Sequence, residues 1–148
     1  MSKKEIEAFL NELSEVRAEL AENSDRKFVV RDTLKAEFDT LYKDYIVEGY
    51  TSGIEGNYGV NTAVRVVEPK TGRRQTLWLS GYEQEHFVNF VNALLESGKD
   101  YPFVCDFLRH KKTAAGSGNE YNRLSILLRA SGDEVTVPAV PDDQYEDN

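Results

Sequence analysis

The apolar residues of this chain change their spacing near Tyr45, and that change limits the folds open to the chain. Before this point they recur at three- and four-residue steps, which is typical of amphipathic helices. From Tyr45 to Arg129 they mostly alternate with polar residues, in short runs separated by turns that contain glycine or proline. This pattern predicts a small β domain preceded by a helical segment.

The charges divide the chain at nearly the same places. Residues 41–130 carry 11 Lys and Arg against 10 Asp and Glu, whereas residues 1–40 carry 7 against 10 and residues 131–148 carry none against 6. The net charge of −8 is therefore carried by the two ends. We predict an N-terminal helical segment over 1–40, a folded domain over 41–130 and a disordered acidic tail over 131–148.

The N-terminal segment is expected to contain helices. From Lys3 to Glu22, apolar residues recur at helical steps and no Gly or Pro intervenes. A second amphipathic stretch, Asp32 to Tyr42, is also expected to be helical. The first helix either packs on the domain core or forms a helical hairpin or a coiled-coil contact that makes a homo-oligomer. Its short apolar seam leaves these alternatives open.

The middle segment is expected to contain five strands and one helix. The strands are predicted at 45–51, 60–68, 73–80, 101–110 and 121–129, with a helix at 81–97 and a flexible loop at 111–120. Gly98 is expected to end the helix. A β-β-β-α-β-β order is that of the OB-fold, a small Greek-key barrel. The predicted class is therefore mainly β, a five-stranded OB-fold-like barrel with a helix between its third and fourth strands.

The segment from Tyr45 to Arg129 resembles an OB-fold single-stranded DNA-binding protein of the bacterial or phage kind. The order of elements, the long loop before the last strand and the acidic C-terminal tail carry this likeness. The bacterial family's tail ends in a hydrophobic dipeptide that partners recognise, whereas this chain ends in DDQYEDN. The resemblance implies that replication or recombination proteins dock on the tail. The residues expected to contact them are Tyr145, as apolar anchor, with Asp142, Asp143, Glu146 and Asp147.

Single-strand binding requires aromatic rings that stack on bases and cations that pair with phosphates on one surface. Strand alternation predicts that Leu77 and Leu79 point inward and Trp78 outward. The alternatives are that Trp78 is a core residue covered by the N-terminal helix and that the arginines form an ordinary solvated face. The residues expected to bind nucleic acid are Trp78, Arg74, Arg65, Arg123, Tyr121, Lys111, Lys112, Tyr50 and Tyr58.

Catalytic and metal-binding patterns are absent from the sequence. Cys105 is the only cysteine, and His86 and His110 lack the spacing of metal ligands. Glu83 and Glu85 are more simply explained as acidic residues that stabilise a helix N-terminus than as a catalytic pair. We expect no catalytic residue, no metal and no cofactor.

The sequence therefore favours a cytoplasmic protein without a membrane span or a signal peptide. Its expected function is to bind single-stranded DNA, or RNA, without strong sequence preference and to protect single strands in replication or recombination. The acidic tail would compete for the basic face, dock partners or only aid solubility. Two other functions remain open: a protein–protein adaptor that uses the N-terminal helices, and an acidic DNA-mimic inhibitor.

Overall fold

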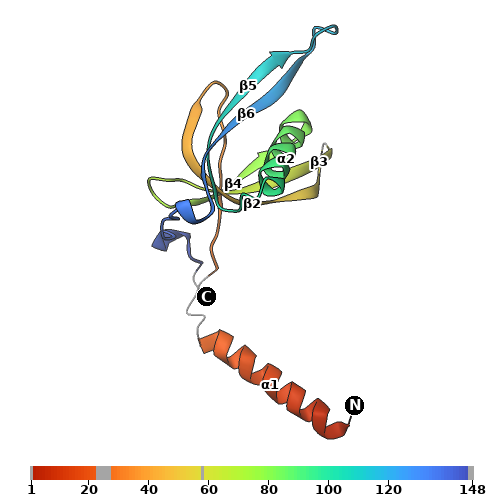
Figure 1. Ribbon diagram of the computed structural model, residues 1–148, viewed down its shortest axis with the longest axis vertical. Helices are drawn as coiled ribbons and strands as arrows, with labels where there is room; N and C mark the ends of the chain where they lie inside the picture. Colours follow the sequence, from red (N-terminus) through yellow and green to blue (C-terminus); the bar gives the residue numbers. More distant parts are fainter. Residues whose placement is uncertain (1, 23–27, 58, 147–148) are drawn as a thin grey trace.

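The computed structural model describes residues 2–22, 28–57 and 59–146, and in helix α1 (Lys3–Glu22) it describes the side chains as far as Leu13. The described residues form a mixed β-sheet, one helix packed on it and one helix apart from it (Figure 1). The mainly-β class predicted from the sequence is confirmed.

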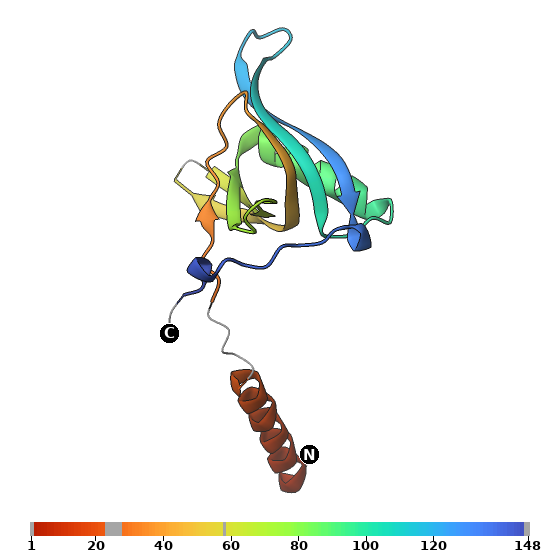
Figure 2. The ribbon, with the colours of Figure 1, turned by 90° about the vertical axis from the view of Figure 1, so that its left-hand side faces the viewer.

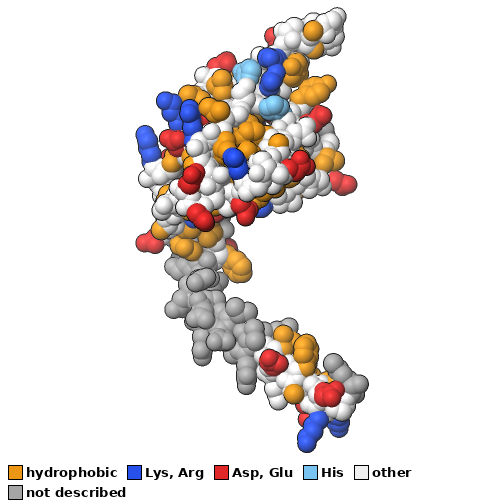
Figure 3. Space-filling view, viewed as in Figure 1, with side chains coloured by type: hydrophobic (Ala, Val, Ile, Leu, Met, Phe, Trp, Pro, Cys, Tyr) orange, Lys and Arg blue, Asp and Glu red, His pale blue; other side chains and the backbone are white. Residues whose placement is uncertain are grey.

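Helix α1 confirms the first predicted helix. A capping box begins it, because the Ser2 hydroxyl accepts from the Glu5 amide and the Glu5 carboxylate accepts from the Ser2 amide, both at 3.3 Å. The helix lies apart from the β domain, and apolar side chains show on its surface (Figure 3). Those of the described part are exposed and contribute nothing to the domain core: Ile6, Phe9, Leu10 and Leu13.

One sheet carries the strands of the described residues. The strands are β1 (Asp32–Thr33), β2 (Leu41–Gly56), β3 (Gly59–Val67), β4 (Arg74–Leu79), β5 (Phe103–Thr113) and β6 (Glu120–Ser131). Their order in the sheet is β1-β4-β3-β2-β5-β6. Only the pairing of β1 with β4 is parallel among these neighbours. Helix α2 (Gly81–Glu96) connects β4 to β5, as predicted.

The predicted helix over 32–42 is wrong. Residues 32–33 pair with β4 instead, and the Leu34 amide donates to the Thr76 carbonyl at 2.9 Å. Ala36 is buried in the core and Leu34 packs against it. The edge of β4 offers this segment backbone hydrogen bonds as well as apolar contacts. The pairing with β4 and the burial of Ala36 outweigh the helix propensity of this segment.

The predicted closed barrel is also wrong, because the sheet is open and has β1 and β6 at its two edges. Strand β1 pairs with the edge of β4 that does not face β3. Helix α2 packs against β6 in one half of the sheet and β3 in the other. The strands β4 and β6 do not pair with each other, so no strand pairing closes the sheet into a barrel.

The core lies between the sheet and α2. Leu77 and Leu79 are buried while Trp78 between them is exposed, which confirms the alternation predicted for β4. Burial of each large apolar side chain contributes about 1.5–3 kcal/mol. The helix ends at Glu96, and Gly98 stops it as predicted: its φ is +92° and its amide donates to the Leu95 carbonyl. The central core residues are Val47, Val64, Val66, Leu77, Leu79, Phe87, Val91, Phe103, Cys105, Phe107 and Leu124.

Asp106 is a buried carboxylate among the apolar residues of β5. Its Oδ1 accepts from the Asp44 amide at 2.9 Å, and its Oδ2 accepts from Arg129 Nε at 2.8 Å. The Asp44 hydrogen bond and, next, Arg129 lower the pKa of Asp106 below its ordinary value. Asp44 has a φ of +58° and lies where the register of β2 shifts against β5. The carboxylate therefore stabilises this irregularity.

The tail, predicted to be disordered, is ordered over 132–146. It contains two short 3₁₀ helices, Gly132–Glu134 and Asp142–Gln144, and crosses beneath the sheet to reach β1 (Figure 2). The Gln144 side chain is buried, and its Nε2 donates to the Arg74 carbonyl at 2.7 Å. The amide of Val30 donates to the Gln144 carbonyl at 2.7 Å. These long-range hydrogen bonds hold a segment that has no hydrophobic periodicity.

Candidate functional site

The outer face of β3 and β4 carries the residues from which the sequence predicts stacking and phosphate contacts. Across this pair Ala63 faces Trp78, Arg65 faces Thr76 and Val67 faces Arg74. Trp78, Arg65 and Arg74 therefore project from the same face, as strand alternation predicts. The Trp78 side chain is 43% exposed, so the alternative that it is a covered core residue is wrong.

Arg65 is the cation nearest to Trp78 in the strand register. Its Cα lies diagonally across from that of Trp78, at about 7–8 Å, and its guanidinium points toward β2, on the side of β3 away from the indole. Its Nη1 donates to the Thr51 hydroxyl at 3.0 Å. Its guanidinium lies over Gly49, where a Cβ would collide with it. Gly49 thus makes room for Arg65 to lie flat on the sheet.

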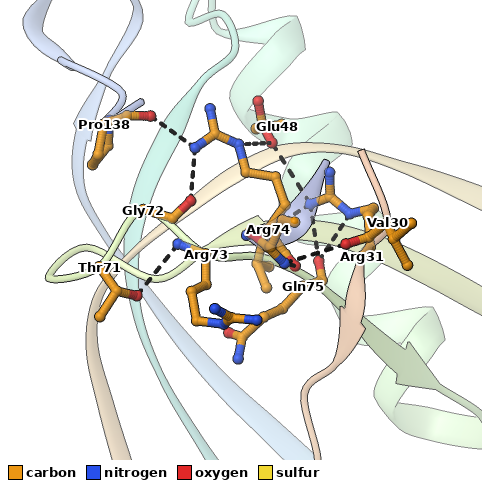
Figure 4. Close-up of polar contacts among 11 residues, drawn as sticks. Val30, Arg31, Glu48, Thr71, Gly72, Arg73, Arg74, Gln75 and Pro138 are labelled. Carbon is orange, nitrogen blue, oxygen red and sulfur yellow. Dashed lines mark hydrogen bonds and ion pairs between the residues drawn. The ribbon is translucent and has the colours of Figure 1, made fainter. Parts of the chain in front are cut away.

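Three arginines, Arg31, Arg73 and Arg74, cluster where β4 begins (Figure 4). The Arg31 guanidinium donates to the carbonyls of Val66 at 2.8 Å and Gln75 at 2.9 Å. It also pairs with Glu48 at 3.6 Å. Burial lowers the pKa of Arg31; the nearby Arg65 and Arg74 lower it further, and Glu48 opposes them. Arg31 was not predicted from the sequence, because no strand pattern surrounds it.

Arg73 and Arg74 already have partners inside the chain. Arg74 donates to the carbonyls of Gly72 at 2.8 Å and Pro138 at 2.7 Å. Arg73 forms ion pairs with Asp32 at 2.6 Å and Asp143 at 2.7 Å, and these carboxylates raise the pKa of its guanidinium. The predicted phosphate contact at Arg74 therefore competes with the tail for the same donor.

The structure places the tail residues expected to dock partners as follows. Asp142, Asp143 and Glu146 are exposed, and Asp147 lies outside the described residues. Tyr145 is half-buried and forms a backbone bridge with Val29. The expected apolar anchor is thus partly engaged by the domain itself, and partner docking stays a prediction.

Tyr121 and Arg123 do not share the surface of Trp78. Both line a hollow between α2 and β6, together with Tyr82 and His86. The prediction that they lie beside Trp78 is wrong, because alternation identifies the face of a strand but not the neighbour that this face meets. Tyr82, which the sequence analysis missed, is 65% exposed in the first turn of α2.

Lys111 and Lys112 are exposed on a strand rather than in a loop. The strands extend further than predicted, so the loop shrinks to residues 114–119 and the β5–β6 hairpin projects from the body (Figure 1). The Lys111 ammonium lies 5.5 Å from the ring centroid of Phe38. Among the described residues, no hydrogen bond or ion pair links either lysine to the face that carries Trp78.

Tyr50 and Tyr58 do not add to the stacking surface. Tyr50 packs against the core, with its ring edge-to-face with Phe87 at 5.7 Å and its hydroxyl donating to Asn92 at 3.3 Å. Tyr58 lies outside the described residues. The predicted stacking role of Tyr50 is therefore corrected to a packing role.

The residues considered for catalysis are separated. Glu83 is buried and bound to Arg109, whereas Glu85 is exposed. Burial raises the pKa of the Cys105 thiol to about 12, with the Asp106 charge adding to the effect. In the part of the chain that the structure describes, no three potential metal ligands gather, and no helix is long and apolar enough to cross a bilayer.

Comparison of the chain with protein-family models, with curated proteins and with solved structures finds no match.

Proposed function

We propose that the chain binds single-stranded DNA, without strong sequence preference, on the outer face of β3 and β4. The observation that carries the proposal is the exposed indole of Trp78 on the same face as the Arg65 guanidinium. An aromatic ring stacks on any base and contributes about 1–3 kcal/mol per base, while arginine pairs with the backbone. This combination favours affinity over sequence selectivity.

The strand order supports the same proposal. Without β1, the order is β4-β3-β2-β5-β6, in which β2 pairs with both β3 and β5. We infer an open variant of the OB-fold, in which β2 to β6 are the five strands and α2 connects the third to the fourth. OB-folds bind oligonucleotides on the face of their second and third strands, which here are β3 and β4.

The charges of this face indicate modest affinity. Arg65 lies on the same face as Trp78 with its guanidinium over β2, while Arg73 and Arg74 are bound to tail groups. Charges in the rest of the chain act weakly here, because the Debye length is about 10 Å at 0.1 M salt. We expect one or two phosphates to be neutralised, which gives a slope of log K against log salt of about −0.7 to −1.4.

The test titrates an oligo-dT, an oligo-U and a duplex of equal length at two salt concentrations. Trp78 is the only tryptophan of the chain, so its fluorescence reports binding at this face. We expect the dT strand to quench it and the duplex to bind more weakly. Trp78→Ala should weaken binding about 5- to 150-fold, and Trp78→Phe should retain most of it. No binding at low salt, or equal affinity for Trp78→Ala, would contradict the proposal.

A second candidate function, a protein–protein adaptor, is favoured by α1. Its described apolar side chains are exposed, with Phe9 at 58% and Leu10 at 54%. Sedimentation of the full chain distinguishes self-association from a free helix. A dimer that becomes a monomer on Phe9→Asp would assign α1 to contact between copies.

A further inference from the structure

A groove between α2 and the first half of β6 lies outside the Trp78 face. It consists of two adjoining hollows that share Tyr82 and Tyr121. One hollow, of about 330 Å³, is completed by Glu85, His86, Asn89 and Arg123. The other, of about 570 Å³, is lined by residues of the hairpin loop and its flanks, 114–120.

The two tyrosines form the wall between the hollows. Their ring centroids are 5.1 Å apart and their planes meet at 66°, an edge-to-face contact. Tyr121 supports the Tyr82 ring from one side, while 65% of Tyr82 remains exposed. A flat aromatic ligand in either hollow would therefore meet a ring that is already held in place.

The polar groups of the groove fit a nucleotide better than an apolar peptide. Arg123 supplies a guanidinium, and among the ion pairs of the described residues none involves it. Asn89 and Glu85 offer donors and acceptors for the edge of a base. The only aliphatic lining groups are Ala114 and Ala115. Histidine and cationic side chains gather where the hairpin leaves the body (Figure 3).

The groove also lies within reach of a strand that passes Trp78. Tyr82 follows Trp78 by four positions in the chain, so their Cα atoms are at most about 14 Å apart. A bound strand covers that span with a few nucleotides. The end of β4 and the first turn of α2 thus carry two exposed aromatic rings close together in the chain.

We propose that this groove is a second nucleotide subsite, in which a base stacks on Tyr82 and a phosphate pairs with Arg123. The inference rests on the proposed binding of single strands and extends their path from β4 onto α2. It makes the hairpin loop one wall of the binding surface and explains why Tyr82 is exposed.

Photocrosslinking separates this proposal from the one on which it rests. The full chain is irradiated with oligo-dT that carries 5-iododeoxyuridine at successive positions, and the crosslinked residues are identified by mass spectrometry. Crosslinks at both Trp78 and Tyr82 or Tyr121 support the subsite. Crosslinks at Trp78 alone overturn the subsite and leave the proposed function standing. Absence of any crosslink and of any binding overturns both.

Variants of the groove provide the second measurement. Tyr82 is exposed, so its replacement leaves the core intact. Tyr82→Ala should weaken binding of a long oligo-dT about 5- to 150-fold, whereas Tyr82→Phe should stay within about twofold. Arg123→Gln should reduce the magnitude of the salt slope by about 0.7, and Arg123→Lys should restore it. Wild-type affinity and salt slope in Tyr82→Ala and Arg123→Gln would refute the subsite.

Discussion

Glu83 and Arg109 form a buried ion pair that joins α2 to β5, with 2.7 Å between Oε2 and Nε. Arg109 also donates to the carbonyl of Ala36 at 3.0 Å and to that of Trp78 at 3.3 Å. One guanidinium thus connects the first turn of α2, the end of β4 and the segment that follows β1. It fixes the backbone between the two proposed stacking rings.

Loss of either partner of this pair is expected to destabilise the domain. Glu83→Gln leaves the Arg109 charge without its carboxylate, which costs about 3–5 kcal/mol at buried sites. The free energy of unfolding in urea measures the change. Glu85→Gln is the matched control, because Glu85 is exposed on the same helix and its replacement should change stability by less than about 0.5 kcal/mol. Equal stability of the two variants would contradict this role of Glu83.

Asp106→Asn should destabilise the domain at neutral pH by about 1.5–3 kcal/mol, because it removes charge-assisted hydrogen bonds from Asp44 and Arg129. The folded state lowers the pKa of Asp106, so its stabilisation is present above the ordinary value of about 3.9 and disappears as pH falls through the folded value. Urea unfolding of wild type and variant at pH 7 and in acid measures this. If wild type and Asp106→Asn still differ in stability at the lowest pH, the ionised carboxylate is not the source of the stabilisation.

The Cys105 thiol should be unreactive in the folded protein. The side chain is 1% exposed, and a pKa of about 12 keeps it protonated at pH 8. A thiol reagent such as Ellman's should therefore react only when urea unfolds the domain, with the same midpoint as circular dichroism. Rapid stoichiometric reaction in native buffer would disprove the burial.

Gln144→Ala should release the ordered tail. It leaves the backbone groups of Arg74 without their buried amide partner, a cost of about 1–3 kcal/mol. Limited proteolysis should then cleave residues 132–146 faster, and oligo-dT should bind more tightly because Arg73 and Arg74 lose tail contacts. Asp142→Asn, exposed in the same 3₁₀ helix, is the control and should change neither. Unchanged proteolysis in Gln144→Ala would show that other contacts hold the tail.

Local sequence patterns predicted the features that depend on neighbouring residues alone, namely the buried face of a strand and the end of a helix. Alternation about Trp78 identified the buried Leu77 and Leu79, because neighbouring side chains of a strand must point to opposite faces. Gly98 marked the end of α2, since a left-handed cap favours glycine there. The first helix and the strand–helix order follow from the same short-range periodicities.

What the sequence determined by itself is therefore which residues can be buried and where α1, α2 and most strands lie. Tertiary structure alone decided which elements meet. Residues 32–33 pair with β4 and do not form a helix. Tyr121 and Arg123 lie in the groove beside Tyr82. The tail is held in place by the buried side chain of Gln144. The physical reason is that backbone hydrogen bonds and ion pairs form between groups far apart in the chain, and periodicity carries no record of those partners.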